Sequence, residues 1–520
     1  MYTISNKIHS RFIQQGIISK QTVVICSKRF VFLTNIFFVA NIFLILYSAL
    51  NPYVDTNVTE MNMNAKLFTK SEKANENYLS RVVKVDNIRL HSNADRLEII
   101  TIDGGNSIVA KDSVKIGDVM IYCAVESALN KEFLSKNNQF EDKELNADVN
   151  AKGFFNKKGR VRAINLRGEP SRGFLFPPGW IEVWRPDMKI QTIEEWVGTE
   201  FDTIDGIQFS KKYIVEIPER KTRTGAKTNR RNKRLKRFDK LIENQFNFHY
   251  DTQALAKYLY KINPDDVISI TEKLHGTSIC VAHILVNRQL KGFEKLLKKM
   301  GVKIQATEYG DIVSSRGVIK NRYINKEVGE GFYDVDIWME ASKRILPVLA
   351  KGEEVFAEIV GYLPNTTKFI QKNHDYRCNE GEFEIYVYRV TYTNPDGIVY
   401  ELSASQVQQW CRSKGLKAVR ELYYGRAKDL YPELDPEQHW HQNFLEKLKN
   451  DKEKFFMECY SPNSYNKIPH EGIVIRNDSD NYMPALKLKT DMHYQWDSSQ
   501  LDKGEIDIET SESVFEIENV

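Results

Sequence analysis

Apolar and polar residues alternate in short runs between residues 80 and 170. The runs at 81–88, 98–102 and 119–125 have this pattern, and turn-forming sequences at 93–97, 104–105 and 117–118 separate them. Alternation with a period of two predicts strands that bury one face. A further strand carrying several arginines is predicted at 160–168. Short strands at this spacing predict a small β-barrel over residues 80–215.

From residue 238 onwards, strand-like runs are interspersed with amphipathic patterns. The runs at 267–271, 355–361, 385–388, 471–476 and 486–489 are rich in apolar residues and predict strands. The patterns at 251–260, 335–349, 403–415 and 435–458 predict helices, and a lysine-rich helix is predicted between 288 and 304. We therefore expect an α+β domain of mostly antiparallel sheets with flanking helices over residues 238–495.

The amino-terminal segment, residues 1–62, conflicts with a plain two-domain interpretation. Residues 30–50 carry no charge and are long enough to span a bilayer. Lys20, Lys28 and Arg29 precede this run and no acidic residue does, so the positive-inside rule would place the rest of the chain away from the cytoplasm. Three interpretations stay open: an extension that is not normally translated, with the start at Met61 or Met63; an anchor of opposite orientation or a targeting segment; or a buried helix.

Charge and cysteine content refine this outline. The chain has 520 residues and a net charge of +4, but basic residues crowd into 220–237 and acidic ones into the last stretch. We expect linkers at 63–79 and 216–237 and an acidic tail at 496–520. The six cysteines include no CxxC pair, which predicts free thiols in a reducing compartment. The expected location is therefore cytoplasmic or nuclear, with membrane attachment only if residues 30–50 are an anchor.

The sequence EKLHGTS at residues 272–278 carries the strongest chemical signal. A neutral lysine amine is a good nucleophile, and Lys273 after a strand suits attack on the α-phosphate of a nucleotide. Gly276 lets the backbone approach the nucleotide because it has no Cβ. A lysine at a strand end is usually a solvated surface residue, but further motifs follow in a fixed order: SSRG at 314–317, VFAEIVG at 355–361, IYVY at 385–388, EGIVIR at 471–476 and LKLK at 486–489.

This ordered set resembles the motifs of the covalent nucleotidyltransferases, which are the polynucleotide ligases and mRNA capping enzymes. His275 resembles RNA ligases more than DNA ligases or capping enzymes, which usually carry aspartate there. The preceding barrel pattern resembles the OB domain of nick-sealing RNA ligases (RNA ligase family 5, the Deinococcus type), and also OB modules that bind tRNA. Over residues 80–495 the resemblance implies an N-terminal OB-type β-barrel followed by a nucleotidyltransferase (ATP-grasp-like ligase) domain.

The resemblance also implies roles for individual residues. Lys273 would form lysyl-AMP, Lys487 and Lys489 would stabilise charge at the α-phosphate, and His275 would support transfer of AMP to RNA. Two residues apart on a strand, the two lysines share a face. Glu358 and Glu471 would hold Mg²⁺ or Mn²⁺, through water. The implied ATP-binding residues are Glu272, Gly276, Arg316, Glu358, Tyr388 (or Tyr386), Glu471, Lys487 and Lys489.

Candidate RNA contacts come from both domains. Ser278 is the last residue of the nucleophile motif, at a position where related RNA ligases often have asparagine. Arg389 follows the stacking tyrosine, where those ligases often have aspartate. Arg160, Arg162 and Arg167 of the barrel, and Arg230 and Arg231 of the basic run, are candidate phosphate contacts. The alternatives are solvated strand-face arginines for the first group, and a flexible linker or nuclear-import signal for the second.

The main functional hypothesis is an ATP-dependent RNA ligase that seals nicks with 3′-OH and 5′-phosphate ends, with RNA, as nicked duplex, as its partner. By the same resemblance the 3′-OH strand must be RNA, while the template strand is DNA or RNA. The alternatives are another covalent nucleotidyltransferase (a DNA ligase or capping enzyme) and an RNA-binding protein with an inactive ligase-like domain. DNA ligases and capping enzymes usually place the OB domain second, whereas the barrel here comes first.

Overall fold

The computed structural model describes residues 67–188, 190, 192–215, 238–249, 251–323 and 335–505. The chain divides into two compact units, Met1–Leu67 and Phe68–Val520. The hydrophobic run 30–50 and the basic run 220–237, with Arg230 and Arg231, lie outside the described residues. No helix within the described ranges is long and apolar enough to cross a membrane.

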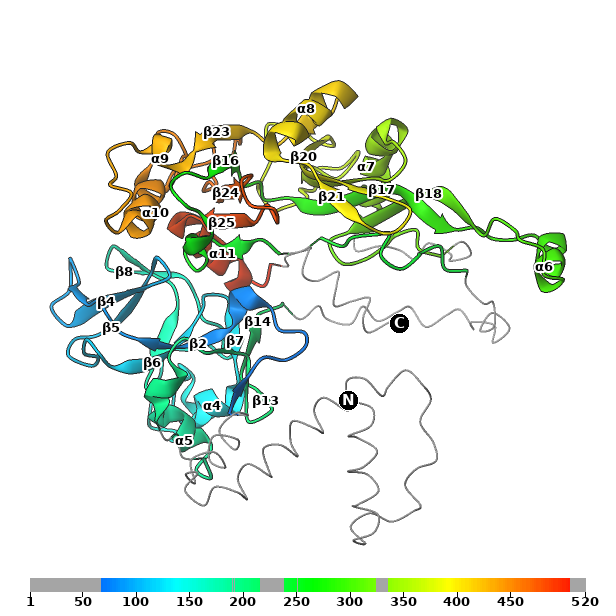
Figure 1. Ribbon diagram of the computed structural model, residues 1–520. Coiled ribbons are helices and arrows are strands. Elements are labelled where there is room, and N and C mark those ends of the chain that lie inside the picture. The colour runs from blue at the N-terminus through cyan, green and yellow to red at the C-terminus, as the bar shows by residue number, and fades with distance from the viewer. Residues whose placement is uncertain are drawn as a thin grey trace, which may run out of the picture. The chain divides into compact units, whose positions relative to one another are not determined.

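The first domain of the second unit is built from short antiparallel strands (Figure 1). One sheet has the order β10-β6-β2-β11, and another has the order β3-β4-β5. Val83, Ile100 and Tyr122 from these sheets share one core, so the alternating runs do bury one face each. The strands are β1 (Phe68–Thr69), β2 (Ser80–Lys84), β3 (Arg89–Leu90), β4 (Leu97–Ile102), β5 (Gly105–Ala110), β6 (Val119–Cys123), β7 (Ser127–Leu129), β8 (Ile164–Leu166), β9 (Glu169–Ser171), β10 (Phe174–Phe176), β11 (Glu200–Phe201), β12 (Thr203–Ile204), β13 (Ile207–Gln208) and β14 (Ser210–Lys212), with helices α4 (Lys131–Lys136) and α5 (Gly179–Trp184).

The second domain contains two larger sheets. The five-stranded sheet has the order β15 (Gln253–Ala254), β25 (Ala485–Lys489), β24 (Gly472–Asn477), β16 (Val267–Glu272), β23 (Glu421–Arg426). The six-stranded sheet has the order β18 (Thr307–Ser315), β17 (Thr277–Asn287), β19 (Glu353–Gly361), β20 (Phe383–Thr393), β21 (Val399–Glu401), with β22 (Lys417–Ala418) also paired to β20. Among the described strands the parallel pairs are β15–β25 and β20–β22, so the expected mostly antiparallel α+β fold is confirmed.

Helices cover each sheet and complete its core. Helices α7 (Ile337–Ile345) and α8 (Ala404–Lys414) bury Trp338 and Val407 against the six-stranded sheet. Helices α9 (Ala427–Leu430) and α10 (Trp440–Asn450) pack on the five-stranded sheet, where Phe444 and Leu448 are buried. The helices predicted at 335–349 and 403–415 are therefore present, while the one predicted at 435–458 is shortened to α10.

The sequence pattern was misleading at three places. Residues 251–260 are not a helix: β15 pairs in parallel with β25, and Leu255 is buried beneath the sheet. Strand pairing and burial there override the local helical pattern. Only residues 164–166 of the run 160–168 form a strand, β8, which makes a hairpin with β9. Helix α11 (Asp491–Asp502) extends into the segment expected to be an acidic tail from residue 496.

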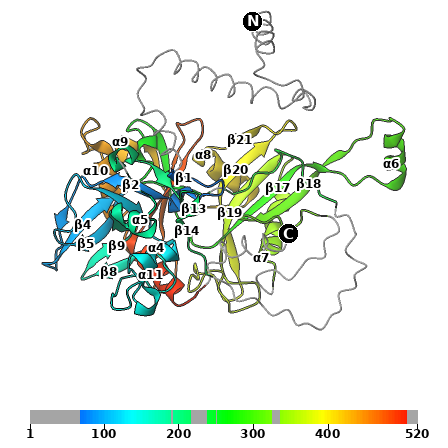
Figure 2. The same ribbon diagram turned by 90° about the horizontal axis from the view of Figure 1, so that it is seen from below.

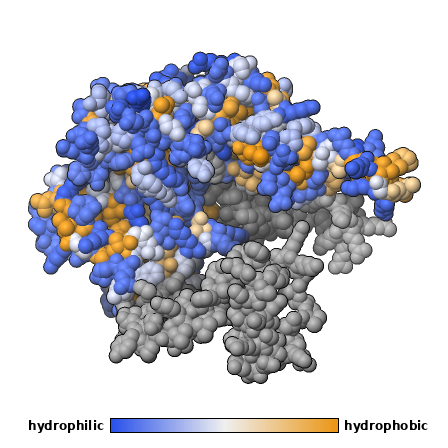
Figure 3. Space-filling model, in the orientation of Figure 1, coloured by the Kyte–Doolittle hydropathy of each residue, from blue (hydrophilic) through white to orange (hydrophobic). Residues whose placement is uncertain are grey.

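Strands β17 and β18 form a long hairpin with the predicted lysine-rich helix, α6 (Gly292–Lys299), at its tip. The hairpin extends away from the rest of the sheet in both ribbon views (Figures 1 and 2). Phe293, Leu296 and Met300 are exposed near this tip, where Figure 3 shows an apolar patch. The nucleophile motif lies at the opposite end of β17, well away from this tip.

Candidate active site

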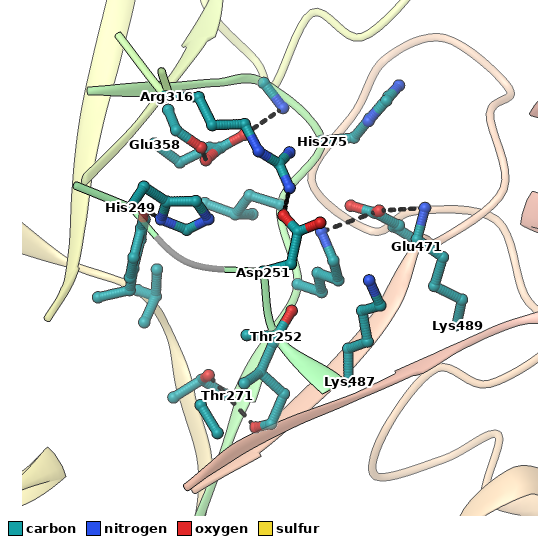
Figure 4. A pocket seen from close by; sticks show the side chains of 18 of the residues that line it. His249, Asp251, Thr252, Thr271, His275, Arg316, Glu358, Glu471, Lys487 and Lys489 are labelled. Carbon is teal, nitrogen blue, oxygen red and sulfur yellow. Dashed lines mark hydrogen bonds and ion pairs between the residues drawn. The ribbon is translucent and has the colours of Figure 1, made fainter. Parts of the chain in front are cut away.

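The link between the two sheets carries the nucleophile motif. Strand β16 of the five-stranded sheet ends at Glu272, and β17 of the six-stranded sheet begins at Thr277. Lys273 therefore lies at the crossing point, where its backbone N–H donates to Gly472 O at 2.9 Å. Because Gly472 begins β24, this bond sets Lys273 beside Glu471. The crossing faces a pocket to which both sheets contribute side chains (Figure 4).

Glu471 is the charge centre of this pocket. Its Oε1 lies 2.9 Å from Lys273 Nζ and 3.0 Å from Lys489 Nζ. The side chain is 2% exposed. Burial alone would raise the pKa of Glu471, but Lys273 and Lys489 outweigh it and hold this pKa well below the ordinary value of 4.5. Glu471 is therefore ionised and fixes two ammonium groups around one oxygen.

Lys487 and Lys489 project from the same face of β25, as expected from their spacing. Leu486 and Leu488 are buried on the opposite face. Burial, followed by Lys489, Lys273 and further cations, lowers the pKa of Lys487 well below 10.5. Burial would also lower the pKa of Lys489, but Glu471 and then Glu126 raise it well above 10.5. The two lysines thus differ in their readiness to lose a proton, although they are two residues apart.

Glu358 lies on β19 next to the nucleophile loop. Its Oε1 accepts a hydrogen bond from Gly276 N at 2.8 Å, and its Oε2 accepts one from Ser278 Oγ at 3.2 Å. Ser278, expected to contact RNA, is 5% exposed and faces this carboxylate. Glu358 therefore fixes the shape of the loop that follows Lys273.

The need for glycine at position 276 has a second physical reason. A Cβ there would lie 2.2 Å from the backbone oxygen of Ile359. The close approach of this loop to strand β19 therefore excludes a side chain, whatever the nucleotide requires. At Gly472, φ is +138° and a Cβ would lie 2.0 Å from Leu488 O.

An aromatic side chain lines the pocket on the six-stranded sheet. Tyr388 Oη lies 3.0 Å from His249 Nδ1. Tyr386 and Tyr388, two residues apart on β20, pack beside Leu274 and Val360. Tyr388, unlike Tyr386, lines the pocket, so it is the better of the two candidates for stacking on a base.

Arg316 and Glu272 have protein partners. The Arg316 guanidinium forms an ion pair with Asp251, a residue without a predicted role. Glu272 is 3% exposed and accepts two hydrogen bonds from Asn463 Nδ2, at 2.8 and 2.6 Å. Its backbone N–H donates to Arg420 O. The Glu272 side chain therefore anchors a neighbouring loop, and Arg316 is held at the pocket by Asp251.

The OB domain contributes side chains that sequence reasoning missed. Tyr78, Glu126 and Lys212 line the same pocket as Lys273. Burial would raise the pKa of Glu126, but Asp497, which hydrogen-bonds to it, and then Lys489 and Lys212 lower it. No motif marks these residues, since their role arises from the packing of two domains.

The barrel arginines occupy different environments. Arg160 is 1% exposed; its Nη2 donates to Ser498 O and Asp502 Oδ1, each at 2.9 Å. The expectation that Arg160 contacts RNA is therefore corrected, because its guanidinium is buried and hydrogen-bonds to Ser498 and Asp502 of helix α11. Arg162 pairs with Glu141 at 2.8 Å, and Arg167 is exposed at the β8–β9 turn with φ +52°.

Potential metal ligands also gather differently from the expected pair of carboxylates. Glu471 groups with His275 and His493, and their ligand atoms all lie within 4.8 Å of one another. Among the described residues, Glu358 is in no such group. Burial and then Lys489 lower the pKa of His493 well below 6.5, and burial and then His275 lower that of His374 to about 3. These imidazoles are neutral, the form that binds metal.

Comparisons with known proteins agree with this architecture. Residues 266–489 match the model of the RNA ligase family, and residues 79–178 match the model of an OB-fold domain. The comparison with curated proteins found no match.

Three solved structures of an RNA ligase from Naegleria gruberi resemble the chain. A ligand-free variant is 14% identical over 81% of this chain and 98% of its own, with a TM-score of 0.46. A variant with AMP and Mn is 14% identical over 81% and 99%, with a TM-score of 0.48. The ligase with PPi is 15% identical over 83% and 99%, with a TM-score of 0.44. Residues 266–489 thus match the RNA ligase family, and in the same chain they follow residues 79–178, which match an OB-fold domain.

Proposed function

We propose that this protein is an ATP-dependent RNA ligase that seals nicks bearing 3′-OH and 5′-phosphate ends through a lysyl-AMP intermediate at Lys273. One observation carries the proposal. Lys273 and Lys489 pair with the buried Glu471 in one pocket that is also lined by Lys487, Arg316, Glu358 and Tyr388. Such a set of cations suits the negative charge that develops during phosphoryl transfer.

In the first step, the Lys273 amine attacks the α-phosphorus of ATP. A nitrogen–phosphorus bond forms, the bond to the bridging oxygen of the β-phosphate breaks, pyrophosphate leaves and the nitrogen gives up a proton. The lysyl-AMP so formed retains the energy of the cleaved bond for transfer. Lys487 and Lys489 are the groups we expect to stabilise negative charge on the α-phosphate oxygens.

In the second step, an oxygen of an RNA 5′-phosphate attacks the AMP phosphorus and Lys273 is released. In the third step, an RNA 3′-OH attacks the adenylylated 5′ end, a phosphodiester forms and AMP leaves. His275 and Ser278, next to Lys273, are the residues we expect to support these steps. Exposed Arg167, Arg162 and the basic run with Arg230 and Arg231 are proposed to contact the RNA backbone.

The proposed cofactor is Mg²⁺ or Mn²⁺, which would neutralise phosphate charge when bound. Glu471 fits this role because its Oε2 is buried and accepts no hydrogen bond from the described residues. Glu358 was expected to hold the ion with Glu471 through water, and its two oxygens already accept bonds from Gly276 and Ser278. We also propose a cytoplasmic or nuclear location, because RNA and ATP are both present there.

The test is labelling of the purified protein with α-labelled ATP or GTP in the presence of a divalent metal, followed by a denaturing gel. Wild type should become labelled from ATP, and Lys273→Ala should lose all label because the nucleophilic nitrogen is gone. Lys343→Ala, on the surface of α7, is the matched lysine control and should label like wild type. A nicked RNA duplex should then be sealed by wild type and by Lys343→Ala, but not by Lys273→Ala.

The other outcomes separate the alternatives. Labelling by GTP alone would move the assignment to a capping enzyme, and sealing of DNA nicks alone to a DNA ligase. Folded protein that binds RNA but takes no label from either nucleotide would leave an RNA-binding protein with an inactive ligase-like domain.

A further inference from the structure

Three histidines gather around Glu471 on the side of helix α11. The His275 ring lies 4.7 Å from the His374 ring and 5.2 Å from the His493 ring, measured between centroids. Trp496 packs against the cluster, 5.0 Å from His374 and 6.0 Å from His493. These side chains come from the nucleophile loop, from the loop after β19 and from α11, so the cluster exists only in the folded domain.

Three members of this cluster, His374, His493 and Glu471, hold buried polar atoms that nothing in the described structure satisfies. His493 is 0% exposed, and neither of its ring nitrogens has a hydrogen-bond partner. Glu471 Oε2 is in the same situation, while Oε1 carries both lysine ion pairs. A buried polar atom without a partner destabilises the folded protein. Native proteins usually satisfy such atoms with protein groups, water or an ion.

The local structure holds His493 towards Glu471. Thr490 N donates to Glu471 O at 3.0 Å, and Thr490 Oγ1 donates to His470 O at 2.7 Å. The same hydroxyl accepts a bond from His493 N at 3.0 Å and so caps α11. One threonine thus ties the residue before β24 to the first turn of α11 and sets the imidazole beside the carboxylate.

The distances suit a metal ion better than a direct bond. His493 Nε2 lies 3.8 Å from Glu471 Oε1, too far for a hydrogen bond. The ligand atoms of His275, Glu471 and His493 all lie within 4.8 Å of one another. Metal–ligand bonds of about 2.0–2.2 Å place ligand atoms roughly 3–3.5 Å apart. Side-chain movements of about 1 Å would therefore bring these three ligand atoms to bonding distance of one ion.

We propose that His275, His493 and Glu471 bind a divalent transition-metal ion directly, through two imidazole nitrogens and one carboxylate oxygen. Imidazole ligands suit Zn²⁺ and similar transition-metal ions such as Co²⁺, whereas Mg²⁺ and Mn²⁺ prefer oxygen ligands. The site differs from a hydrated ion shared by Glu358 and Glu471. It deepens the proposed function, since Glu471 Oε1 holds Lys273, and it adds His493, which lies outside the predicted motifs. His374, which hydrogen-bonds to Lys372 O through Nδ1 at 2.8 Å, is a positioning residue.

The test is titration of chelator-treated, full-length protein with Co²⁺ in the absence of nucleotide, followed by visible absorption. Wild type should bind one equivalent with d–d bands of a nitrogen- and oxygen-ligated ion. His493→Gln and His275→Gln should each weaken binding at least tenfold. His283→Gln, whose ring pairs with Asp311 on the distant part of β17, is the matched control and should bind like wild type. Equal binding by wild type and His493→Gln would overturn the proposal.

Wild-type protein alone supplies a second measurement if a variant fails to fold. X-ray absorption of the Co²⁺-loaded protein should show the multiple scattering of two imidazoles, and a spectrum of oxygen ligands only would overturn the site. Labelling of Lys273 with Mg²⁺ and ATP separates the two proposals. If Lys273 is labelled but Co²⁺ is not bound by histidines, the metal site is contradicted and the ligase proposal stands. If histidines bind Co²⁺ but Lys273 takes no label, the ligase proposal is contradicted and the metal site stands.

Discussion

Lys487 illustrates how a single residue can serve chemistry at the expense of stability. It is half-buried beside Lys273, Lys489 and Arg316, and burial and these cations lower its pKa. A Lys487→Met variant keeps the apolar stem and removes the charge. We expect it to gain about 1 kcal/mol of unfolding free energy while losing ligation, a common exchange at active sites. Denaturant unfolding and a nick-sealing assay measure the two effects.

The pH dependence of this gain has a definite sign. The pKa of Lys487 is lower in the folded than in the unfolded protein, so the unfolded state binds the proton more tightly. The gain from Lys487→Met should be full at pH values below the lowered pKa and should shrink as pH rises towards the ordinary value of 10.5. A gain that grows over this range would contradict the assignment.

Tyr388 makes a second prediction at the level of one side chain. Its ring lines the pocket and its hydroxyl reaches His249. If the ring stacks on adenine, Tyr388→Leu should raise the KM for ATP about tenfold, because base–aromatic stacking contributes about 1–3 kcal/mol. Tyr388→Phe, the matched control, should stay within about threefold of wild type. Equal effects of both variants would assign the role to the hydroxyl instead.

The positions of site residues were predictable where the spacing of residues along a strand determines which side chains lie together. Lys487 and Lys489 share a strand face because the side-chain period of a strand is two, and Lys273 and Glu471 meet because their strands are neighbours. The position of His493 was not predictable, since it depends on how α11 follows β25. One local signal did exist: threonine is a preferred helix-capping residue, and His493 lies in the first turn of the helix that Thr490 caps.

At the scale of elements, β24 depends on the glycine at its start. A Cβ at Gly472 would meet Leu488 O at 2.0 Å, and φ is +138°. Gly472→Ala should therefore destabilise the fold by about 3 kcal/mol or more and displace Glu471 from Lys273. Gly415→Ala at the end of α8 is the matched control, with φ +69° but nothing within 4 Å of a Cβ. It should cost about 1 kcal/mol, measured by denaturant unfolding.

Elements were predictable where the pattern within one segment decides the structure. Helix α8 has its own capping box, Ser403 with Gln406, and ends at Gly415. The residues at its two ends are therefore enough to predict where it begins and ends. Residues 251–260 carry an equally helical pattern, yet Gln253 and Ala254 add a strand to β25, which is more than 200 residues away along the chain. A pattern within residues 251–260 cannot predict pairing with a strand that lies so far away along the chain.

At the scale of the whole molecule, Arg160 joins the OB domain to helix α11. Its guanidinium is buried and bonds to Ser498 and Asp502. Arg160→Met should cost about 2–4 kcal/mol of unfolding free energy, because the buried Ser498 loses its donors and the partly exposed Asp502 loses an ion-pair partner. Arg162→Met is the matched control; its side chain is 19% exposed and it should cost less than about 1 kcal/mol. Thermal unfolding of both variants measures the difference, and equal costs would contradict a special role for Arg160.

This clamp has a consequence for the synthesis of the protein. Arg160 and Asp502 are 342 residues apart, so at about 5–20 residues per second the barrel emerges from the ribosome roughly 20–70 s before its partner helix is made. Throughout that interval the barrel holds an arginine at a position designed for burial, with no carboxylate or carbonyl to receive it. The OB domain is therefore made first but is among the last parts to be completed. Until α11 is synthesised, the surface around Arg160 in the nascent chain lacks the helix that covers it.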